Sequence, residues 1–225
     1  MSLILNIDTA TEIAHVSIAK DGFVLKDLFN EEQKTHAGFL QPAIKQLLKE
    51  AGIILTDLDA IAVTKGPGSY TGLRIAMASA KGLCFAINKP LITIDTLELI
   101  ARSAIIKLQD QPINAPTLLC PMIDARRMEV FTALYDLSLK NILPSCAMIL
   151  EENSFKDFFN NYFIIFFGGG SKKWENICYN KNSSFQQVAI LSEAMSDLSE
   201  KKFGKNDLCD IAYSQPAYIK DFYIK

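Results

Sequence analysis

The residues best suited to chemistry lie in a glycine-rich turn at residues 66–72, Gly-Pro-Gly-Ser-Tyr-Thr-Gly, between an apolar run and a helical pattern. Such a turn can present backbone N–H groups to phosphate. It is not a P-loop, because no Lys-Ser/Thr pair follows a glycine at the required spacing, and its glycine spacing is one residue too long for the dinucleotide fingerprint. Neither histidine has an acidic partner suggested by the sequence. Ser69 and Thr71 are therefore interpreted as helix-capping hydroxyls rather than nucleophiles.

The histidines and cysteines form no metal-binding or disulfide pattern. His15 and His36 are twenty-one residues apart, His15 in a strand pattern and His36 at the start of a helix. We expect a hydrogen-bonded structural role for His15 and a surface or capping role for His36. The 5 cysteines are dispersed, without CxxC spacing, and indicate reduced core residues. We therefore expect no metal and no cofactor.

Strand and helix patterns alternate in the first half of the chain. Residues 2–29 predict a three-stranded meander with Asp21-Gly22 at one turn. Pro42 suits the next helix only near its first turn, and Gly52 marks the helix end. The pattern that follows is typical of parallel strands joined by helices. In chain order we expect strands at 2–7, 13–19 and 23–29, a helix at 36–51, a strand at 58–63, a helix at 71–86, a strand at 91–94 and a helix at 97–108.

The second half repeats the opening of the first. After a proline-containing break at residues 109–116, Ile123-Asp124 echoes Ile7-Asp8 at a separation of 116 residues, and each aspartate ends a strand before a hairpin. The duplication predicts two similar lobes, 1–108 and 109–225. The pattern weakens beyond residue 149, so we expect an abbreviated second lobe. Its remaining predicted elements are a helix at 154–160, a strand at 162–167, a glycine turn at 168–170 and helices at 172–179 and 191–202.

The helix predicted at residues 71–86 has little charged surface. Its two charged residues, Arg74 and Lys81, are seven apart and share one narrow stripe. Small side chains follow at four-residue steps, at Gly72, Ala76, Ala80 and Cys84. We predict that one face of this helix lies on a sheet and that the small-residue ridge docks a second polypeptide. The alternative is a helix buried entirely within its own chain.

Composition limits the function further. Lys+Arg 23 against Asp+Glu 25 gives a formal net charge of -2 and a pI near 5.8, which disfavours unaided binding to nucleic acid. No apolar run approaches the roughly 20 residues that span a bilayer. The first residues lack the basic region and the apolar length of a secretory signal. We therefore expect a cytoplasmic protein.

Three motifs are informative together: Leu5-Asn6-Ile7-Asp8-Thr9-Ala10, the run GPGSYTGLRI at residues 66–75 and the run IDARRMEV at residues 123–130. They resemble the bacterial TsaB (YeaZ) family of tRNA threonylcarbamoyladenosine biosynthesis proteins, in an order and spacing that cover at least the first two thirds of the chain. The resemblance implies an α/β, two-lobed, ribonuclease H-like fold of the actin, Hsp70 and sugar-kinase type. This agrees with the duplicated meander.

The resemblance also implies a function, that of an accessory subunit for threonylcarbamoyl transfer to adenosine in tRNAs that read ANN codons. In that family TsaD is catalytic and carries a metal site, TsaE supplies an ATPase, and TsaB holds the complex together. The TsaD metal site needs a His-x-x-x-His pair, which this chain lacks. We therefore expect a subunit that is not itself an enzyme and that meets tRNA only indirectly, through the complex.

The interface implied for TsaD, or for a homodimer of the chain alone, involves the helices at residues 36–51 and 71–86. The expected interface residues are His36, Leu40, Ile44, Leu47, Gly72, Leu73, Ala76, Met77, Ala80 and Leu83.

In the implied fold, the turn after each first strand contacts phosphate. Possible nucleotide-binding residues are Asp8, Thr9, Thr11, Arg126, Gly168 and Gly169. The first turn lacks the glycine usual in kinases and chaperones of this class, so an equal alternative is that Asp8 and Thr11 only close the hairpin. Phosphate contact, interface pairing and surface exposure stay open for Arg126 and Arg127. A competing function is a degenerate ATP-dependent phosphotransferase or hydrolase acting alone.

Overall fold

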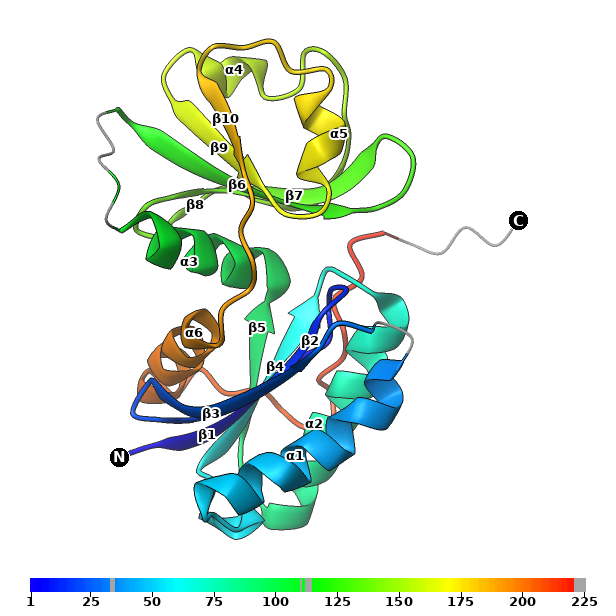
Figure 1. Ribbon diagram of the computed structural model, residues 1–225, viewed down its shortest axis with the longest axis vertical. Coiled ribbons are helices and arrows are strands. Elements are labelled where there is room, and N and C mark those ends of the chain that lie inside the picture. Colours follow the sequence, from blue (N-terminus) through cyan, green and yellow to red (C-terminus); the bar gives the residue numbers. More distant parts are fainter. Residues whose placement is uncertain (33–34, 110, 112–114, 221–225) are drawn as a thin grey trace. The chain divides into compact units, whose positions relative to one another are not determined.

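The computed structural model describes residues 1–32, 35–109, 111 and 115–220. The chain forms two compact units, each built on a five-stranded mixed sheet (Figure 1). The first unit comprises Met1–Thr96 and Leu191–Ala217, and the second comprises Leu97–Ile190 with the residues from Tyr218 onward. In the described part of the chain, no helix has the length and apolar character needed to cross a membrane.

The first sheet has the strand order β3-β2-β1-β4-β5. Its strands are β1 (Leu3–Asp8), β2 (Ala14–Lys20), β3 (Phe23–Asn30), β4 (Ala60–Gly66) and β5 (Leu91–Asp95). β1, β2 and β3 pair antiparallel, and β4 runs parallel to both β1 and β5. The predicted meander and parallel pattern are confirmed. Asp21 and Gly22 both have positive φ at the predicted turn.

Two helices cover one face of the first sheet. α1 (His36–Ala51) and α2 (Tyr70–Ile87) contribute Leu40, Leu47, Ala76 and Ala80 to a core shared with Leu5. α1 ends at Gly52 in the left-handed conformation, as predicted, and a 3-10 helix, η2 (Leu55–Asp57), leads to β4. Pro42 was expected near the first turn of α1 but lies in the second, where it cannot donate to the carbonyl of Gly38.

The opposite face of the first sheet carries a polar contact with α6 (Ser192–Gly204). Leu5 belongs to the core under α1 and α2, and Asn6, which points to the other face, donates from Nδ2 to Ser196 Oγ at 3.3 Å. Ser192 Oγ donates to Asp27 Oδ2 of β3 at 2.9 Å. Residues 191–217 therefore complete the first unit and do not belong to a separate C-terminal lobe at 109–225.

The division of the chain also differs from the expected boundary at residue 108. α3 (Thr96–Leu108) buries Leu97, Ala101 and Leu108 against the sheet of the second unit, in a cluster that includes Leu119 and Phe167. The helix was predicted at nearly these residues, but its apolar face packs against strands that follow it in the sequence and not against the first sheet. The second unit therefore begins at residue 97.

The second sheet repeats the first, with the strand order β10-β9-β6-β7-β8. Its strands are β6 (Thr117–Asp124), β7 (Glu129–Asp136), β8 (Asn141–Ile149), β9 (Phe163–Phe167) and β10 (Ser183–Gln186). β9 pairs parallel with β6, as β4 does with β1, so the predicted duplication is confirmed. β10 was not predicted.

Short helices cover the second sheet on the face away from α3. α4 (Lys156–Phe159) and α5 (Ser171–Glu175) are both shorter than predicted. Between them and the sheet lies an aromatic cluster in which Phe166 contacts Phe155 edge-on at a centroid distance of 5.4 Å and Trp174 at 6.1 Å. This unit is the abbreviated one, with single-turn helices where the first unit has α1 and α2.

Candidate functional site

The carboxyl end of β1 places Asp8 beside the end of β4. Asp8 is 2% exposed, and its Oδ1 accepts hydrogen bonds from the Ala10 N–H at 2.9 Å and from Thr64 Oγ1 at 2.7 Å. Its Oδ2 is buried without a hydrogen-bond partner in the described residues. Burial raises the pKa of Asp8 above its ordinary value, although these two hydrogen bonds act in the opposite direction.

The glycine-rich turn packs directly on the residues after Asp8. A Cβ on Gly68 would come within 2.2 Å of the Ala10 carbonyl oxygen, and one on Gly72 within 2.0 Å of the Thr9 carbonyl oxygen. The Ser69 N–H donates to Ala10 O at 2.7 Å, and Thr9 Oγ1 donates to Gly72 O at 2.7 Å. Backbone and hydroxyl groups that could meet a phosphate are thus engaged within the chain. The turn needs glycine for close packing.

The capping role predicted for Ser69 is confirmed, since its Oγ accepts a hydrogen bond from the Gly72 N–H at 3.2 Å. The capping role predicted for Thr71 is wrong, because Thr71 lies inside α2 after the N-cap residue and is exposed. Thr11 is half-buried with its Oγ1 3.4 Å from the Ile13 carbonyl oxygen. Asp8 closes the turn through Ala10, as the structural alternative expected. Nucleotide binding by Asp8, Thr9 and Thr11 stays a prediction.

The histidines lie near Asp8. His15 is the cross-strand partner of Asp8 and its pKa is lowered, chiefly by burial. His36 was expected at the surface or as a cap, but it is 2% exposed, with Nε2 3.4 Å from Thr11 O. It is buried because α1 starts against the turn after β1. Within the described ranges no three His, Cys, Asp or Glu side chains are grouped so as to hold a metal ion.

The turn after β6 is the second polar site. Asp124 Oδ1 accepts hydrogen bonds from the Arg126 N–H at 2.6 Å and from Lys173 Nζ at 2.9 Å. Desolvation acts to raise the pKa of Asp124, but these two donors hold it below its ordinary value. Arg126 and Arg127 have φ of 72° and 46°. A left-handed conformation costs an L-residue roughly 1–2 kcal/mol, so this turn is strained twice.

The glycine turn at residues 168–170 lies beside this site. A Cβ on Gly168 would come within 2.5 Å of the Met122 carbonyl oxygen, and one on Gly170 within 2.8 Å of the Val130 side chain. A Cβ on Gly169 would meet no atom within 4 Å. Gly168 and Gly170 are thus required by packing against β6 and β7. The structure brings Gly168–Gly170 close to Asp124 but leaves a nucleotide role for Gly168, Gly169 and Arg126 as a prediction.

The small-residue ridge of α2 faces inward. Gly72, Ala76, Ala80 and Cys84 are all buried against the sheet of their own unit. The same holds for most other residues expected at the partner interface, namely His36, Leu40, Ile44, Leu47, Leu73 and Met77. Only Leu83 is partly exposed. The prediction that this ridge docks a second polypeptide is wrong, because the sheet of the same unit covers it. Four-residue spacing shows that these residues share one face of the helix, but it does not show what packs against that face.

The opposite side of α2 is exposed and carries the charged Arg74 among small and apolar side chains. Thr71, Ala78, Gly82 and Phe85 are separated by seven, four and three residues, so they form one stripe, here called the outer stripe. Phe85 is 83% exposed. A Cβ on Gly82 would meet no atom within 4 Å, so no contact in the described chain requires glycine there. Glycine inside a helix costs about 1 kcal/mol relative to alanine, and close approach of another backbone would explain it.

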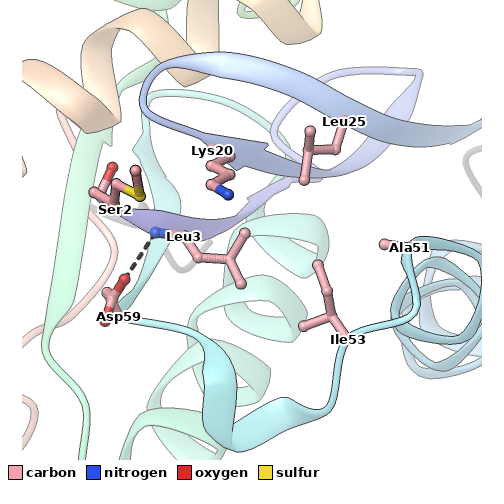
Figure 2. A pocket seen from close by; sticks show the side chains of 8 residues that line it. Ser2, Leu3, Lys20, Leu25, Ala51, Ile53 and Asp59 are labelled. Atoms are coloured by element: carbon pink, nitrogen blue, oxygen red, sulfur yellow. Dashed lines mark hydrogen bonds between the residues drawn. The ribbon is translucent and has the colours of Figure 1, made fainter.

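A surface cavity of about 280 Å³ lies at the other end of the first sheet (Figure 2). Leu3, Lys20 and Ile53 line it, and Asp59 Oδ2 accepts the Leu3 N–H at 2.9 Å on its wall. The cavity sits at the amino ends of β1 and β4. Ligands of open α/β sheets usually bind at the carboxyl ends of the strands, which is the edge where Asp8 lies and not the edge of this cavity.

Comparison with known proteins agrees with this architecture. The family model for TsaD, tRNA N6-adenosine threonylcarbamoyltransferase, matches residues 28–221. The chain is 30% identical to the tRNA threonylcarbamoyladenosine biosynthesis protein TsaB of Bacillus subtilis (strain 168) over 152 residues, which cover 66% of this chain and 63% of that protein. It is 38% identical to TsaB of Escherichia coli (strain K12) over 132 residues, covering 59% and 54%. The chain thus spans less than two thirds of the length of these relatives.

Solved structures show the fold. YeaZ from Pseudomonas aeruginosa superposes with a TM-score of 0.75 at 26% identity, over 97% of this chain and 100% of that one. An inorganic polyphosphate/ATP-glucomannokinase from Arthrobacter superposes with a TM-score of 0.51 at 11% identity, over 92% of this chain and 100% of that one, a likeness of fold alone. The two-lobed fold of the actin and sugar-kinase type, expected from the family resemblance and in agreement with the duplicated meander, is confirmed.

Proposed function

Because the chain belongs to the TsaD family of tRNA N6-adenosine threonylcarbamoyltransferases and has curated relatives named TsaB, we propose that it is an accessory subunit in tRNA threonylcarbamoyladenosine biosynthesis. In this proposal it does not catalyse the transfer. It binds a TsaD-type catalytic subunit, within a complex that also includes a TsaE-type ATPase, and it pairs with itself when alone. The cytoplasm is the compartment that this role requires.

The outer stripe of α2 carries the proposal. It combines an exposed aromatic side chain, Phe85, with Ala78 and Gly82, whose small size leaves the helix backbone accessible. Such a surface suits a second helix that approaches closely, and the apolar area of Phe85 supplies an anchor for it. The proposed interface is therefore on the helix that the sequence indicated, but on its opposite face.

The closed turn after β1 supports the accessory role. Ser69 N–H, Ala10 N–H and Thr9 Oγ1 are engaged in hydrogen bonds within the chain, and Asp8 is buried. A phosphotransferase of this fold would have to free these groups to bind the phosphates of ATP. The structure favours packing over phosphate binding at this turn. The alternative, a phosphotransferase or hydrolase acting alone, requires ATP turnover that depends on Asp8.

The test is association with the TsaD-type subunit. Ala78→Glu places a charge on the outer stripe without filling the core, because Ala78 is exposed. We expect a folded chain whose co-purification with the TsaD-type subunit falls by at least about 30-fold, since a buried unpaired charge costs several kcal/mol. Asn161→Glu, at an exposed position of the second unit, is the matched control and should associate normally.

Two outcomes contradict the proposal. Normal association of Ala78→Glu would exclude the outer stripe as the interface. Robust ATP turnover by the free chain that is lost in Asp8→Asn would replace the accessory role by the phosphotransferase or hydrolase. In cells, depletion of the chain should lower the threonylcarbamoyladenosine content of total tRNA nucleosides measured by mass spectrometry.

A further inference from the structure

Arg126 and Arg127 form an exposed cationic pair at the turn between β6 and β7. In the described part of the chain, neither guanidinium makes an ion pair or a hydrogen bond. Both residues hold a left-handed φ, which glycine or asparagine adopts more readily than arginine. The accessory role proposed above makes no use of this pair. The turn thus places two exposed arginine side chains next to each other.

The acidic groups beside the pair are already neutralised. Asp124 is bound by Lys173 Nζ at 2.9 Å and by the Arg126 N–H, and Glu129 Oε2 is paired with Lys220 Nζ. The turn therefore presents a local positive charge that is uncompensated, on a chain whose formal net charge is -2. That charge is available to an anion from outside the unit.

Three backbone N–H groups of the turn are already engaged within it. The Arg126 N–H donates to Asp124 Oδ1, the Glu129 N–H to Arg126 O at 3.0 Å, and the Ala125 N–H to Glu129 O at 3.1 Å. A turn that binds a nucleotide phosphate typically offers such N–H groups and encloses the ligand. Here the two guanidinium forks are offered from an exposed position. This is the chemistry of contact with a phosphodiester backbone that passes over the surface.

We propose that the Arg126-Arg127 turn binds the phosphodiester backbone of RNA. The choice of RNA as the polyanion rests on the proposed function, in which tRNA is the substrate of the complex. The contact is local and independent of base sequence. It refines the expectation that the chain meets tRNA only indirectly, because the net charge of -2 makes binding by the free chain weak but does not remove this site.

The test uses the full chain and an unmodified transcript of a tRNA that reads ANN codons, with binding followed by fluorescence anisotropy from about 20 to 150 mM salt. The double variant Arg126→Gly/Arg127→Gly removes both charges and suits the positive φ, so its melting temperature should equal or exceed that of the wild type. We expect its affinity at low salt to fall at least about 10-fold, and the slope of log K against log salt to decrease by about 2.

Two further variants distinguish binding at this turn from a general effect of positive charge on the protein surface. Arg126→Lys/Arg127→Lys keeps both charges and should retain most of the binding. Lys156→Gln/Lys181→Gln removes the same charge from two exposed positions of the second unit and should bind as the wild type does. Equal losses in this control and in the glycine variant would overturn the proposal.

Two other results would also overturn it. One is a wild-type chain that does not bind the transcript at about 20 mM salt. The other is evidence for a nucleotide site at this turn. In that case ATP would displace the transcript from the wild type, and ATP would not bind the glycine variant. Since the measurement uses the free chain, it does not depend on TsaD-type association. A failure of co-purification would count against the accessory role and leave this result intact.

Discussion

Thr64 Oγ1 donates a 2.7 Å hydrogen bond to Asp8 Oδ1 and thereby joins the ends of the parallel strands β1 and β4. The other carboxylate oxygen of Asp8 is buried without a partner in the described residues. The environment therefore favours the protonated carboxyl group, and the folded protein binds that proton more tightly than the unfolded chain does.

Asp8→Asn should change how stability depends on pH. Because the folded pKa of Asp8 is raised, wild-type stability should fall as pH rises from the ordinary value of 3.8 through the raised value. The variant lacks this ionisation, so the difference in unfolding free energy, variant minus wild type, should increase with pH across that window. Urea denaturation between about pH 4 and pH 8 measures it. A pH-independent difference would contradict the prediction.

Asp136→Asn is a control in which the pH dependence of stability should change in the opposite direction. The pKa of Asp136 is lowered, chiefly by the Ser138 hydroxyl group, so its carboxylate stabilises the fold above 3.8 and this contribution is lost as pH falls. The difference, variant minus wild type, should therefore decrease with rising pH in this case.

Gly72→Ala should destabilise the first unit severely. The added Cβ would lie 2.0 Å from the Thr9 carbonyl oxygen, so α2 must move away from β1. We expect a loss of about 3 kcal/mol or more, measured by urea denaturation. A variant within about 0.5 kcal/mol of the wild type would show that this close contact is absent in solution.

Gly82→Ala, ten residues further along the same helix, should have the opposite effect on stability. The new methyl group meets no atom within 4 Å, so the helix gains about 1 kcal/mol. If a partner backbone packs against Gly82, the same change should weaken association with the TsaD-type subunit. Calorimetric melting and co-purification give the two readings. Unchanged association would remove the case for close helix packing at this residue.

Truncation after Ile190 should unfold the first unit and spare the second. It removes the contacts of α6 with β1 and β3, and the hydrogen bonds from Cys209 N–H to Leu91 O at 2.8 Å and from Ala217 N–H to Lys65 O at 2.7 Å. From the second unit it removes only the residues from Tyr218 onward, with the ion pair between Lys220 and Glu129, and leaves residues 97–190 intact. The single tryptophan, Trp174, is buried in the second unit and reports its state. We expect native tryptophan emission together with rapid proteolysis within residues 1–96. Loss of native emission would contradict the independence of the two units.

Sequence periodicity was enough to predict the duplicated meander, because Ile7-Asp8 and Ile123-Asp124 each end a buried strand before a hairpin. It could not orient α2, since Gly72 and Ala76 on the inner face and Ala78 and Gly82 on the outer face are similarly small. The fold distinguishes the two faces, because a Cβ added to Gly72 would lie 2.0 Å from Thr9 O, whereas one added to Gly82 would meet no atom within 4 Å.

Sequence patterns also could not assign α6 to its sheet. Its buried face includes Ser192, Ser196 and Ser199, which a hydropathy pattern treats as solvent-exposed. The signal that could have found the contact is the polar stripe of the strands beneath, Asn6 and Asp27, which needs hydrogen-bonding partners. At the turn after β6, the strain at Arg126 and Arg127 had no signature in the residue types.

The return of residues 191–217 to the first sheet has a consequence for biosynthesis. A ribosome that has just completed β5 must still translate the whole of the second unit before α6 becomes available, a delay of roughly 5 to 20 s at typical elongation rates. During this interval the polar face of the nascent first sheet is without its covering helix. The second unit has its sheet and helices in one continuous segment, residues 97–190, and can mature first, so the amino-terminal half of this protein is the last to be finished.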